Sequence, residues 1–235
     1  MFVKICANTN LEDALLAVEM GADAVGFVFA PSKRQVTVGK ASEIVDGLPE
    51  SVEKVGVLVP GVFPATDARD IALTVTAAGL TAVQLHGAFD SALVRALDAE
   101  FDGGLKIIQT VAYAVDAVDR MAADEAFEAA LRAVFAEPAV WAVLVDAAKS
   151  GVSGGLGVAF DWAQVAGIVE RASGDREPRP RVILAGGLRA ETVGEAIASF
   201  APWGVDVASG VEASAGKKDP ERLRAFIANA RATER

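Results

Sequence analysis

The sequence predicts a single α/β domain of the (β/α)₈ barrel class, in which eight parallel strands alternate with eight helices. Three observations predict it. The chain of 235 residues has the length of one such barrel, and 52% of it is hydrophobic, which fills a large core. Short β-branched runs alternate with helix-patterned stretches eight times. No Pro-rich or Ser/Gly-rich linker divides the chain, so we expect one domain over residues 1–235.

The strands are expected where apolar residues follow one another without alternation, because strands of a parallel sheet are covered on both faces. Such runs lie at residues 3–6, 24–29, 54–59, 82–85, 106–111, 141–146, 181–184 and 205–208. Helices are expected to begin near Asn10, Gly39, Thr66, Asp90, Val115, Asp161, Ala190 and Asp219, several of which are good helix-capping residues. The fifth unit is unusually long, since residues 113–137 are rich in Ala and acidic residues and suit one long helix or two. We interpret that stretch as a helical elaboration outside the barrel.

Composition excludes several classes of partner. The net charge is −10 and basic residues do not cluster, whereas nucleic acids and anionic membranes are bound mainly through Lys and Arg. No apolar run is long enough to cross a bilayer, and the first residues lack the pattern of a signal peptide. One Cys and one His allow neither an intrachain disulfide nor a Cys/His zinc set. We therefore expect a cytoplasmic protein that binds a small molecule, but no nucleic acid, membrane or metal.

Chemistry in such a barrel is expected where the strands end and the following loops begin. Cys6 ends the first strand, where a thiolate would be able to take a proton or attack a carbon, although a lone Cys is often an inert core residue. Asp146 ends the sixth strand, where burial would raise its pKa into the range useful to a general acid. The alternative is that Asp146 caps the amides of the loop after it.

Glycine-rich turns follow the last strands. Gly186 and Gly187 come after the seventh strand, and Ser209 and Gly210 come after the eighth, where barrels commonly hold a phosphate on backbone N–H groups. Gly155 lies in a third glycine-rich turn, after Asp146. Asp206, in the eighth strand, is expected to bond ribose hydroxyls or to brace the loop.

Two further polar residues follow strands. Arg34 comes after the second strand, and its planar fork suits a substrate carboxylate; the alternative is a solvated loop cation, which is what we expect of its neighbour Lys33. His86 comes after the fourth strand and is expected to polarise substrate or to make a structural hydrogen bond in the barrel mouth.

With these positions assembled, the sequence resembles the phosphoribosylanthranilate isomerase family of tryptophan biosynthesis over nearly its whole length. The resemblance rests on a series of motifs in the right order: 4–6 (KIC), 21–29 (GADAVGFVF), 32–34 (SKR), 83–87 (VQLHG), 160–162 (FDW), 185–188 (AGGL), 204–212 (GVDVASGVE) and 216–219 (GKKD).

The resemblance implies that Cys6 is the general base and Asp146 the general acid of an Amadori rearrangement. The substrate would be N-(5-phosphoribosyl)anthranilate and the product 1-(2-carboxyphenylamino)-1-deoxyribulose 5-phosphate. It also implies that Arg34 faces the anthranilate carboxylate, that the last two turns bind the phosphate, and that no cofactor is needed. His86, Gly155 and Asp206 are our further candidates for substrate contact. The chain is expected to act as a monomer or a homodimer.

The chain departs from the family pattern at two loops. Ala7 stands where the family usually has Gly, and Leu156 stands where a loop hydroxyl is usual. Two alternative readings remain: the related isomerase of histidine biosynthesis, and a non-catalytic barrel that binds phosphosugars. Cys6 disfavours the first, because that family is expected to use Asp at this position. The presence of both Cys6 and Asp146 counts against the second.

Overall fold

The computed structural model describes residues 1–62, 64–149, 152–153 and 161–232. Within these ranges, eight parallel strands form one closed sheet in the order β5-β4-β3-β2-β1-β9-β8-β6, and pairing of β5 with β6 closes the barrel. The strands are β1 (Phe2–Ile5), β2 (Ala24–Val28), β3 (Glu53–Leu58), β4 (Ala82–Leu85), β5 (Lys106–Ala114), β6 (Val140–Lys149), β8 (Val182–Leu184) and β9 (Gly204–Val207). The predicted barrel is confirmed.

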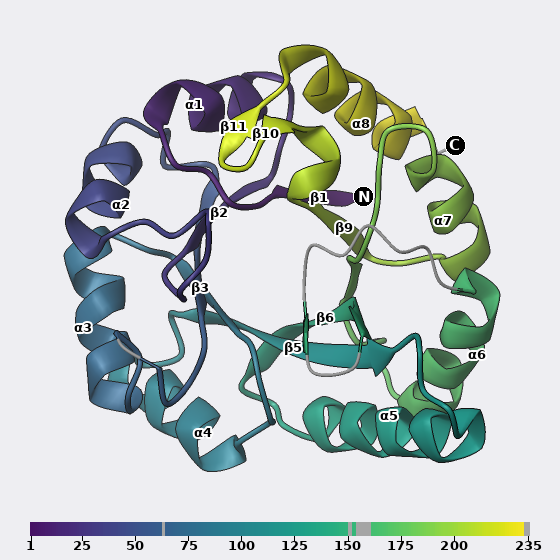
Figure 1. Cartoon of the computed structure of the whole chain (residues 1–235). Coiled ribbons are helices and arrows are strands. Elements are labelled where there is room, and N and C mark those ends of the chain that lie inside the picture. The colour runs from purple at the N-terminus through teal and green to yellow at the C-terminus, as the bar shows by residue number, and fades with distance from the viewer. Residues whose placement is uncertain (63, 150–151, 154–160, 233–235) are drawn as a thin grey trace.

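An outer ring of helices surrounds the sheet (Figure 1). The helices are α1 (Leu11–Glu19), α2 (Val38–Val45), α3 (Ala68–Ala78), α4 (Ser91–Glu100), α5 (Arg120–Phe135), α6 (Trp162–Ser173), α7 (Val193–Phe200) and α8 (Pro220–Ala232). Most begin at a side chain that accepts a hydrogen bond from the first turn, as at Asn10, Asp90 and Asp161. Local capping therefore places helix starts close to the predicted positions.

The long fifth unit contains one helix of 16 residues, α5, which takes its place in the ring. It begins later than the expected Val115, because β5 continues to Ala114 and Asp119 is the residue that caps the helix through the amide of Ala122. The extra length of residues 113–137 is thus shared between a long strand and a long helix.

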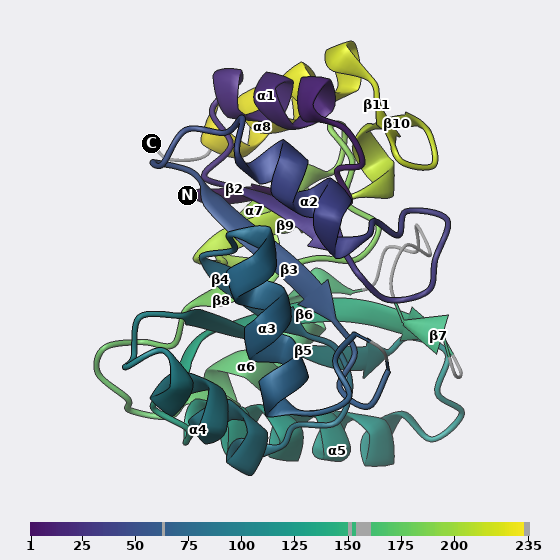
Figure 2. The same ribbon diagram turned by 90° about the vertical axis from the view of Figure 1, so that its left-hand side faces the viewer.

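The βα loops carry small additions. β7 (Val152–Ser153) pairs antiparallel with β6, and the short helix η1 (Ser209–Val211) follows β9. A two-stranded hairpin, β10 (Glu212–Ser214) and β11 (Lys217–Lys218), comes next. Figure 2 shows β7, β10 and β11 together at the end of the barrel opposite the two chain termini.

The core has two layers. One large cluster packs the outer faces of the strands against the helices. A smaller cluster fills the barrel interior, where alanines such as Ala24 and Ala82 alternate with larger aliphatic side chains such as Ile108. Near the N-terminal end of the strands, Phe2 stacks on Trp203 with ring centroids 4.7 Å apart, and Trp141 meets both rings edge-on. The interior is therefore apolar at this end.

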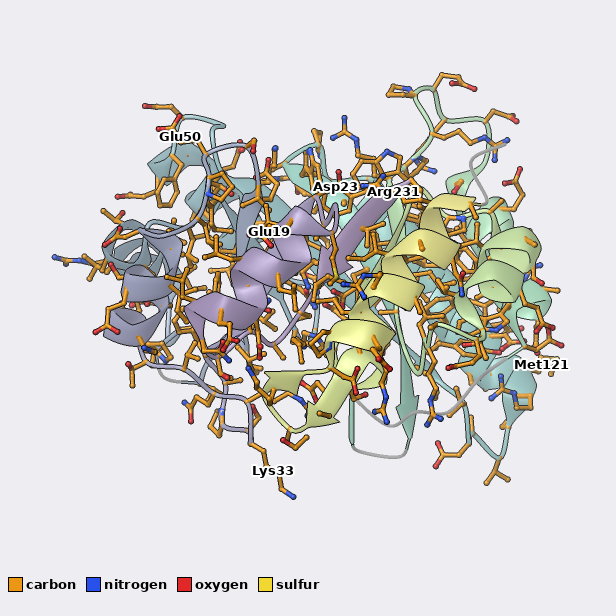
Figure 3. All side chains as sticks on the ribbon, turned by 90° about the horizontal axis from the view of Figure 1, so that it is seen from above. Glu19, Asp23, Lys33, Glu50, Met121 and Arg231 are labelled. Carbon is orange, nitrogen blue, oxygen red and sulfur yellow. The ribbon has the colours of Figure 1, made fainter. Side chains whose placement is uncertain are left out.

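The N-terminal face also joins the two ends of the chain. Arg231 of α8 contacts Asp23, at 2.6 Å, and the Asp23 carboxylate accepts from the Val3 amide (Figure 3). Lys33 extends from the opposite end of the molecule into solvent, as expected (Figure 3). Across the ranges described, none of the helices has the length and apolar character that crossing a membrane requires.

Candidate active site

A cavity of roughly 320 Å³ opens at the C-terminal ends of the strands. It is lined by nine of the ten candidate residues: Cys6, Arg34, His86, Asp146, Gly186, Gly187, Asp206, Ser209 and Gly210. The tenth, Gly155, lies outside the described residues, as does Leu156. Residues up to 204 positions apart in the sequence thus meet in one cavity because parallel strands all end at the same face.

Cys6 follows β1 and continues its pairing, since its amide donates to the Val207 carbonyl at 2.8 Å. Its thiol is free and only 6% of the residue is exposed. Burial raises the pKa of the Cys6 thiol, while the nearby ammonium groups of Lys4 and Lys218 act in the opposite direction. The environment therefore opposes a thiolate through desolvation and favours it through two cations.

Asp146 lies at the cavity wall on β6. Burial, reinforced by the negative charge of Asp206, raises the pKa of the Asp146 carboxyl to about 7. A hydrogen bond from the Ala147 amide acts in the opposite direction. A carboxyl group with such a pKa is partly protonated at neutral pH, so it is able to donate a proton to substrate.

His86 is largely buried at the end of β4. Burial lowers the pKa of His86 to about 4, and the charge on Lys4 acts in the same direction. The imidazole is therefore neutral at neutral pH. It is suited to hydrogen bonding with a ligand rather than to forming an ion pair with an anionic group.

Arg34 reaches the cavity in a fixed orientation. Its Nε and Nη2 atoms donate to the Glu212 carboxylate, with the shortest distance 2.7 Å. Glu212 also accepts from the Gly216 amide and lies 3.4 Å from the Lys218 ammonium. The arginine is therefore not a solvated loop cation, because the hairpin after β9 holds it at the cavity edge.

The two phosphate-binding candidates are packed against each other. Gly186 and Gly187 have φ values of +86° and +67°, a region that favours glycine. A Cβ on Gly210 would lie 2.0 Å from the Leu188 carbonyl oxygen. Only glycine allows these two turns to approach so closely, which brings both to the cavity.

Ala7, one of the departures from the family pattern, adopts a left-handed conformation with φ of +62° and is buried. A non-glycine residue in this region costs roughly 1–2 kcal/mol. The first loop therefore keeps a backbone shape suited to glycine even though the residue is alanine.

Four buried residues that shape the site are not among the candidates predicted from the sequence: Lys4, Gln84, Glu212 and Lys218. Lys4 carried a signal, because it lies two residues before Cys6 on a strand and so faces the same side. Gln84 likewise lies two before His86, and its Oε1 atom has no hydrogen-bond partner. The other two come from the hairpin after β9, whose packing no local pattern predicts.

In the part of the chain that the structure covers, no three or more His, Cys, Asp or Glu side chains gather in a way that would hold a metal ion. Catalysis without a metal remains a prediction.

Comparisons with known proteins give a consistent result. The model of the N-(5'-phosphoribosyl)anthranilate (PRA) isomerase family matches residues 3–229. An N-(5'-phosphoribosyl)anthranilate isomerase of Listeria welshimeri is 36% identical over 234 residues, covering 100% of both chains. The crystal structure of phosphoribosyl anthranilate isomerase from Thermotoga maritima has a TM-score of 0.78 at 34% identity, covering 99% of both chains.

A further crystal structure of a phosphoribosyl anthranilate isomerase is a complex with reduced 1-(o-carboxyphenylamino)-1-deoxyribulose 5-phosphate. It has a TM-score of 0.76 at 34% identity and covers 99% of both chains. Sequence and architecture thus agree along the whole length, including the strands that carry Cys6 and Asp146. The chain belongs to the N-(5'-phosphoribosyl)anthranilate isomerase family.

Proposed function

We propose that the cavity at the barrel mouth binds N-(5'-phosphoribosyl)anthranilate and that Cys6 and Asp146 divide the proton transfers of its rearrangement. The protein is an isomerase of tryptophan biosynthesis, so the reaction is the Amadori rearrangement to the carboxyphenylamino-deoxyribulose phosphate. The observation that carries the assignment of roles is that the two residues line one cavity in different electrostatic surroundings.

Asp146 is the general acid in this proposal. Opening the ribose ring requires a proton on the ring oxygen, and a carboxyl group with a pKa of about 7 still carries one at neutral pH. The opened sugar becomes an iminium ion, which acidifies the hydrogen on the neighbouring C2 carbon. Its positive charge is formed next to a carboxylate that has just lost its proton.

Cys6 is the general base. Its thiolate removes the C2 proton, and the electron pair left behind forms the enolamine, which tautomerises to the ketose. Each positioned proton transfer contributes about 10²–10⁴-fold to the rate. Burial makes the thiolate more basic than it would be in water, so it is a stronger acceptor once formed.

The remaining candidates hold the substrate. The turns at Gly186–Gly187 and Ser209–Gly210 offer backbone donors to the phosphate, and Arg34 offers its guanidinium to the anthranilate carboxylate. His86 and Asp206 face the sugar between these ends, and Gly155 is assigned to the same contact from sequence alone. Because the described side chains all line one chain's cavity, the reaction requires no second copy, whether the protein is a monomer or a homodimer.

We also propose that residues 1–235 act as one domain and that the enzyme works in the cytoplasm. The single closed sheet supports the first statement, since it joins strands from β1 to β9. The second is supported by the free thiol that the mechanism needs, because the cytosol keeps thiols reduced.

The decisive experiment follows the fluorescence decay of freshly made phosphoribosylanthranilate with and without the protein. We expect the wild type to accelerate the decay and Cys6→Ser to fold but lose most of the turnover, since a hydroxyl is a far weaker base than a thiolate. Both proteins should bind the reduced product analogue. Tight binding of that analogue without turnover by the wild type would instead indicate a non-catalytic phosphosugar-binding barrel.

A further inference from the structure

A lysine lies inside the barrel directly below the site. Lys4, on β1, is 0% exposed, and its Nζ atom donates to Asp206 Oδ1 at 2.8 Å. The same ammonium interacts electrostatically with the thiol of Cys6. A buried cation without a full set of partners costs several kcal/mol, so a lysine at this position is expected to have a role beyond packing.

Gly26 on the neighbouring strand makes room for this arrangement. A Cβ on Gly26 would lie 2.8 Å from Cys6 Sγ and 3.2 Å from Lys4 Nζ, so the two groups flank the same small space. The sulfur and the ammonium are thus brought together by their spacing of two residues, Lys4 on β1 and Cys6 just after it, and by the absence of a side chain at Gly26 on β2.

We propose that Lys4 is a positioning residue that stabilises the thiolate of Cys6, and that its ion pair with Asp206 places a cation beside the base and an anion near the acid. This inference rests on the proposed roles of Cys6 and Asp146 and extends them. The pair presents its positive end to the base, whereas its negative end disfavours ionisation of the acid.

Other charged groups face Cys6 from neighbouring elements. Lys218, on β11, donates to the Cys6 carbonyl oxygen at 2.5 Å, and its charge also favours the thiolate. Asp206, on β9, acts in the opposite direction, and Arg34 interacts with Cys6 through its charge. Among these cations, Lys4 has the largest favourable effect on the thiolate.

Lys4 also faces the other titratable groups of the cavity. Its charge lowers the pKa values of both His86 and Asp146, acting against Asp206 in each case. Removing the cation is therefore expected to raise the pKa of Cys6 and, to a smaller degree, that of Asp146. A purely structural lysine would give neither shift.

The test is the titration of the only cysteine in the chain. The absorbance of the thiolate is followed from neutral to alkaline pH in the wild type and in Lys4→Met, with Cys6→Ser as the blank. The pKa of the single tyrosine, Tyr113, is raised to about 12 by burial, so it interferes little. We expect the midpoint in Lys4→Met to rise by about one unit or more, which lowers the thiolate fraction about tenfold at a given pH.

The matched control is Lys54→Met. Lys54 is also buried, on β3, but its ammonium donates to the carbonyl oxygens of Pro49 and Glu50 on the loop before that strand. Its removal should leave the Cys6 midpoint unchanged. Because Lys4→Met leaves Asp206 without its cation, the double variant Lys4→Met/Asp206→Asn provides a second test without that unpaired charge, and should shift the midpoint in the same direction by less.

Kinetics add a second readout. With an acid of pKa about 7 and a more basic thiol, kcat/KM should rise with pH to about 7, level off and fall only when the thiol ionises. In Lys4→Met the plateau value of kcat/KM should fall about tenfold for each unit by which the pKa of the Cys6 thiol rises. The alkaline limb of the profile should move to higher pH, and KM should change little.

A thiol midpoint that stays at its wild-type value in a folded Lys4→Met protein, or in the double variant, would overturn the inference even if activity falls. The proposed roles fail differently: if Cys6→Ser retains turnover, Cys6 is not the base, although the thiol titration still reports whether Lys4 stabilises its thiolate. The two failures are therefore distinguishable.

Discussion

At the scale of single residues, burial shifts two titratable groups of the cavity towards their neutral forms. It raises the pKa of Asp146 to about 7 and lowers that of His86 to about 4. Burial shifts the two pKa values in opposite directions, because the charged form of Asp146 is an anion and that of His86 is a cation. The site therefore holds a neutral acid and a neutral imidazole in a slightly acidic medium.

Replacing Asp146 by Asn should remove the transferable proton while keeping the shape of the side chain. We expect a loss of about 10²–10⁴-fold in kcat, with little change in the affinity for the reduced product analogue. Stopped-flow or steady-state fluorescence of phosphoribosylanthranilate measures kcat, and calorimetry measures the affinity for the analogue. Near wild-type turnover in this variant would remove Asp146 from the mechanism.

The same substitution should change stability in a pH-dependent way. The folded state of the wild type binds one more proton at Asp146 than the unfolded state between about pH 4 and 7, so its contribution to stability is lost as pH rises through 7. Asp146→Asn avoids this loss. It should match the wild type near pH 4 and exceed it above pH 7 by on the order of a few kcal/mol in urea unfolding.

His86 gives the opposite slope between about pH 4 and 6.5, where the unfolded state binds the extra proton. The two effects partly cancel in the wild type. The difference between wild type and Asp146→Asn isolates the carboxyl group, and a difference that is constant with pH would contradict the raised pKa.

Glu212 is expected to set the affinity for the substrate carboxylate through Arg34. Glu212→Gln keeps the volume but removes the charge that holds the guanidinium, so KM should rise about tenfold, or ~1.4 kcal/mol, with a smaller effect on kcat. Glu43→Gln, at an exposed ion pair with Lys40, is the control and should leave both constants unchanged. Equal KM values in the two variants would mean that Arg34 needs no such support.

At the scale of elements, the strands and turns of the mouth meet where side chains are missing. Gly26 on β2 faces Lys4 on β1 and Cys6 just after it, and Gly210 after β9 faces Leu188 after β8. At both positions an added methyl group would clash with the neighbouring strand or turn. The absence of a side chain therefore sets how closely these segments approach one another in the site.

Gly26→Ala should therefore damage catalysis more than folding. The new Cβ would lie 2.8 Å from Cys6 Sγ and force the thiol to move, which should lower kcat by about 10-fold or more, since misplacement of about 1 Å can cost 100-fold. Gly39→Ala, in α2 with open space around it, is the control and should keep full activity. Full activity in Gly26→Ala would show that the thiol tolerates displacement.

At the scale of the whole molecule, the two ends of the barrel differ in composition and in role. The N-terminal face carries the aromatic cluster of Phe2, Trp141 and Trp203 and the Asp23–Arg231 ion pair, which join distant parts of the chain. The opposite face carries the cavity with its polar groups. Packing and chemistry are thus separated along the barrel axis, as in other barrels of this class.

Turnover should not depend on a metal ion, because the proposed acid, base and phosphate-binding groups all belong to the protein. We expect full activity after dialysis against EDTA and competitive inhibition by inorganic phosphate, which would occupy the turns at Gly187 and Ser209–Gly210. Loss of activity with EDTA that a divalent ion restores would contradict the first expectation. Purely non-competitive inhibition by phosphate would contradict the second.

The sequence alone determined much of the fold. Apolar strand runs and local helix caps predicted the eight units, because burial on both strand faces and hydrogen bonding in the first helical turn are local requirements. The fold class then placed Cys6, Asp146 and the two glycine turns at one face, since each was predicted at the C-terminal end of a strand. In the structure β6 continues past Asp146 to Lys149, and the side chain still lines the cavity.

The orientation and the pKa values of these side chains depend on tertiary contacts that the sequence does not reveal. The pairing of Arg34 with Glu212 and the hydrogen bond from Lys218 to the Cys6 carbonyl depend on the hairpin that follows β9. The proximity of Lys4 to Asp206 joins residues 202 positions apart. Charge interactions and desolvation depend on distance in space rather than along the chain, so the residues that set the pKa values of the site become visible only when the barrel closes.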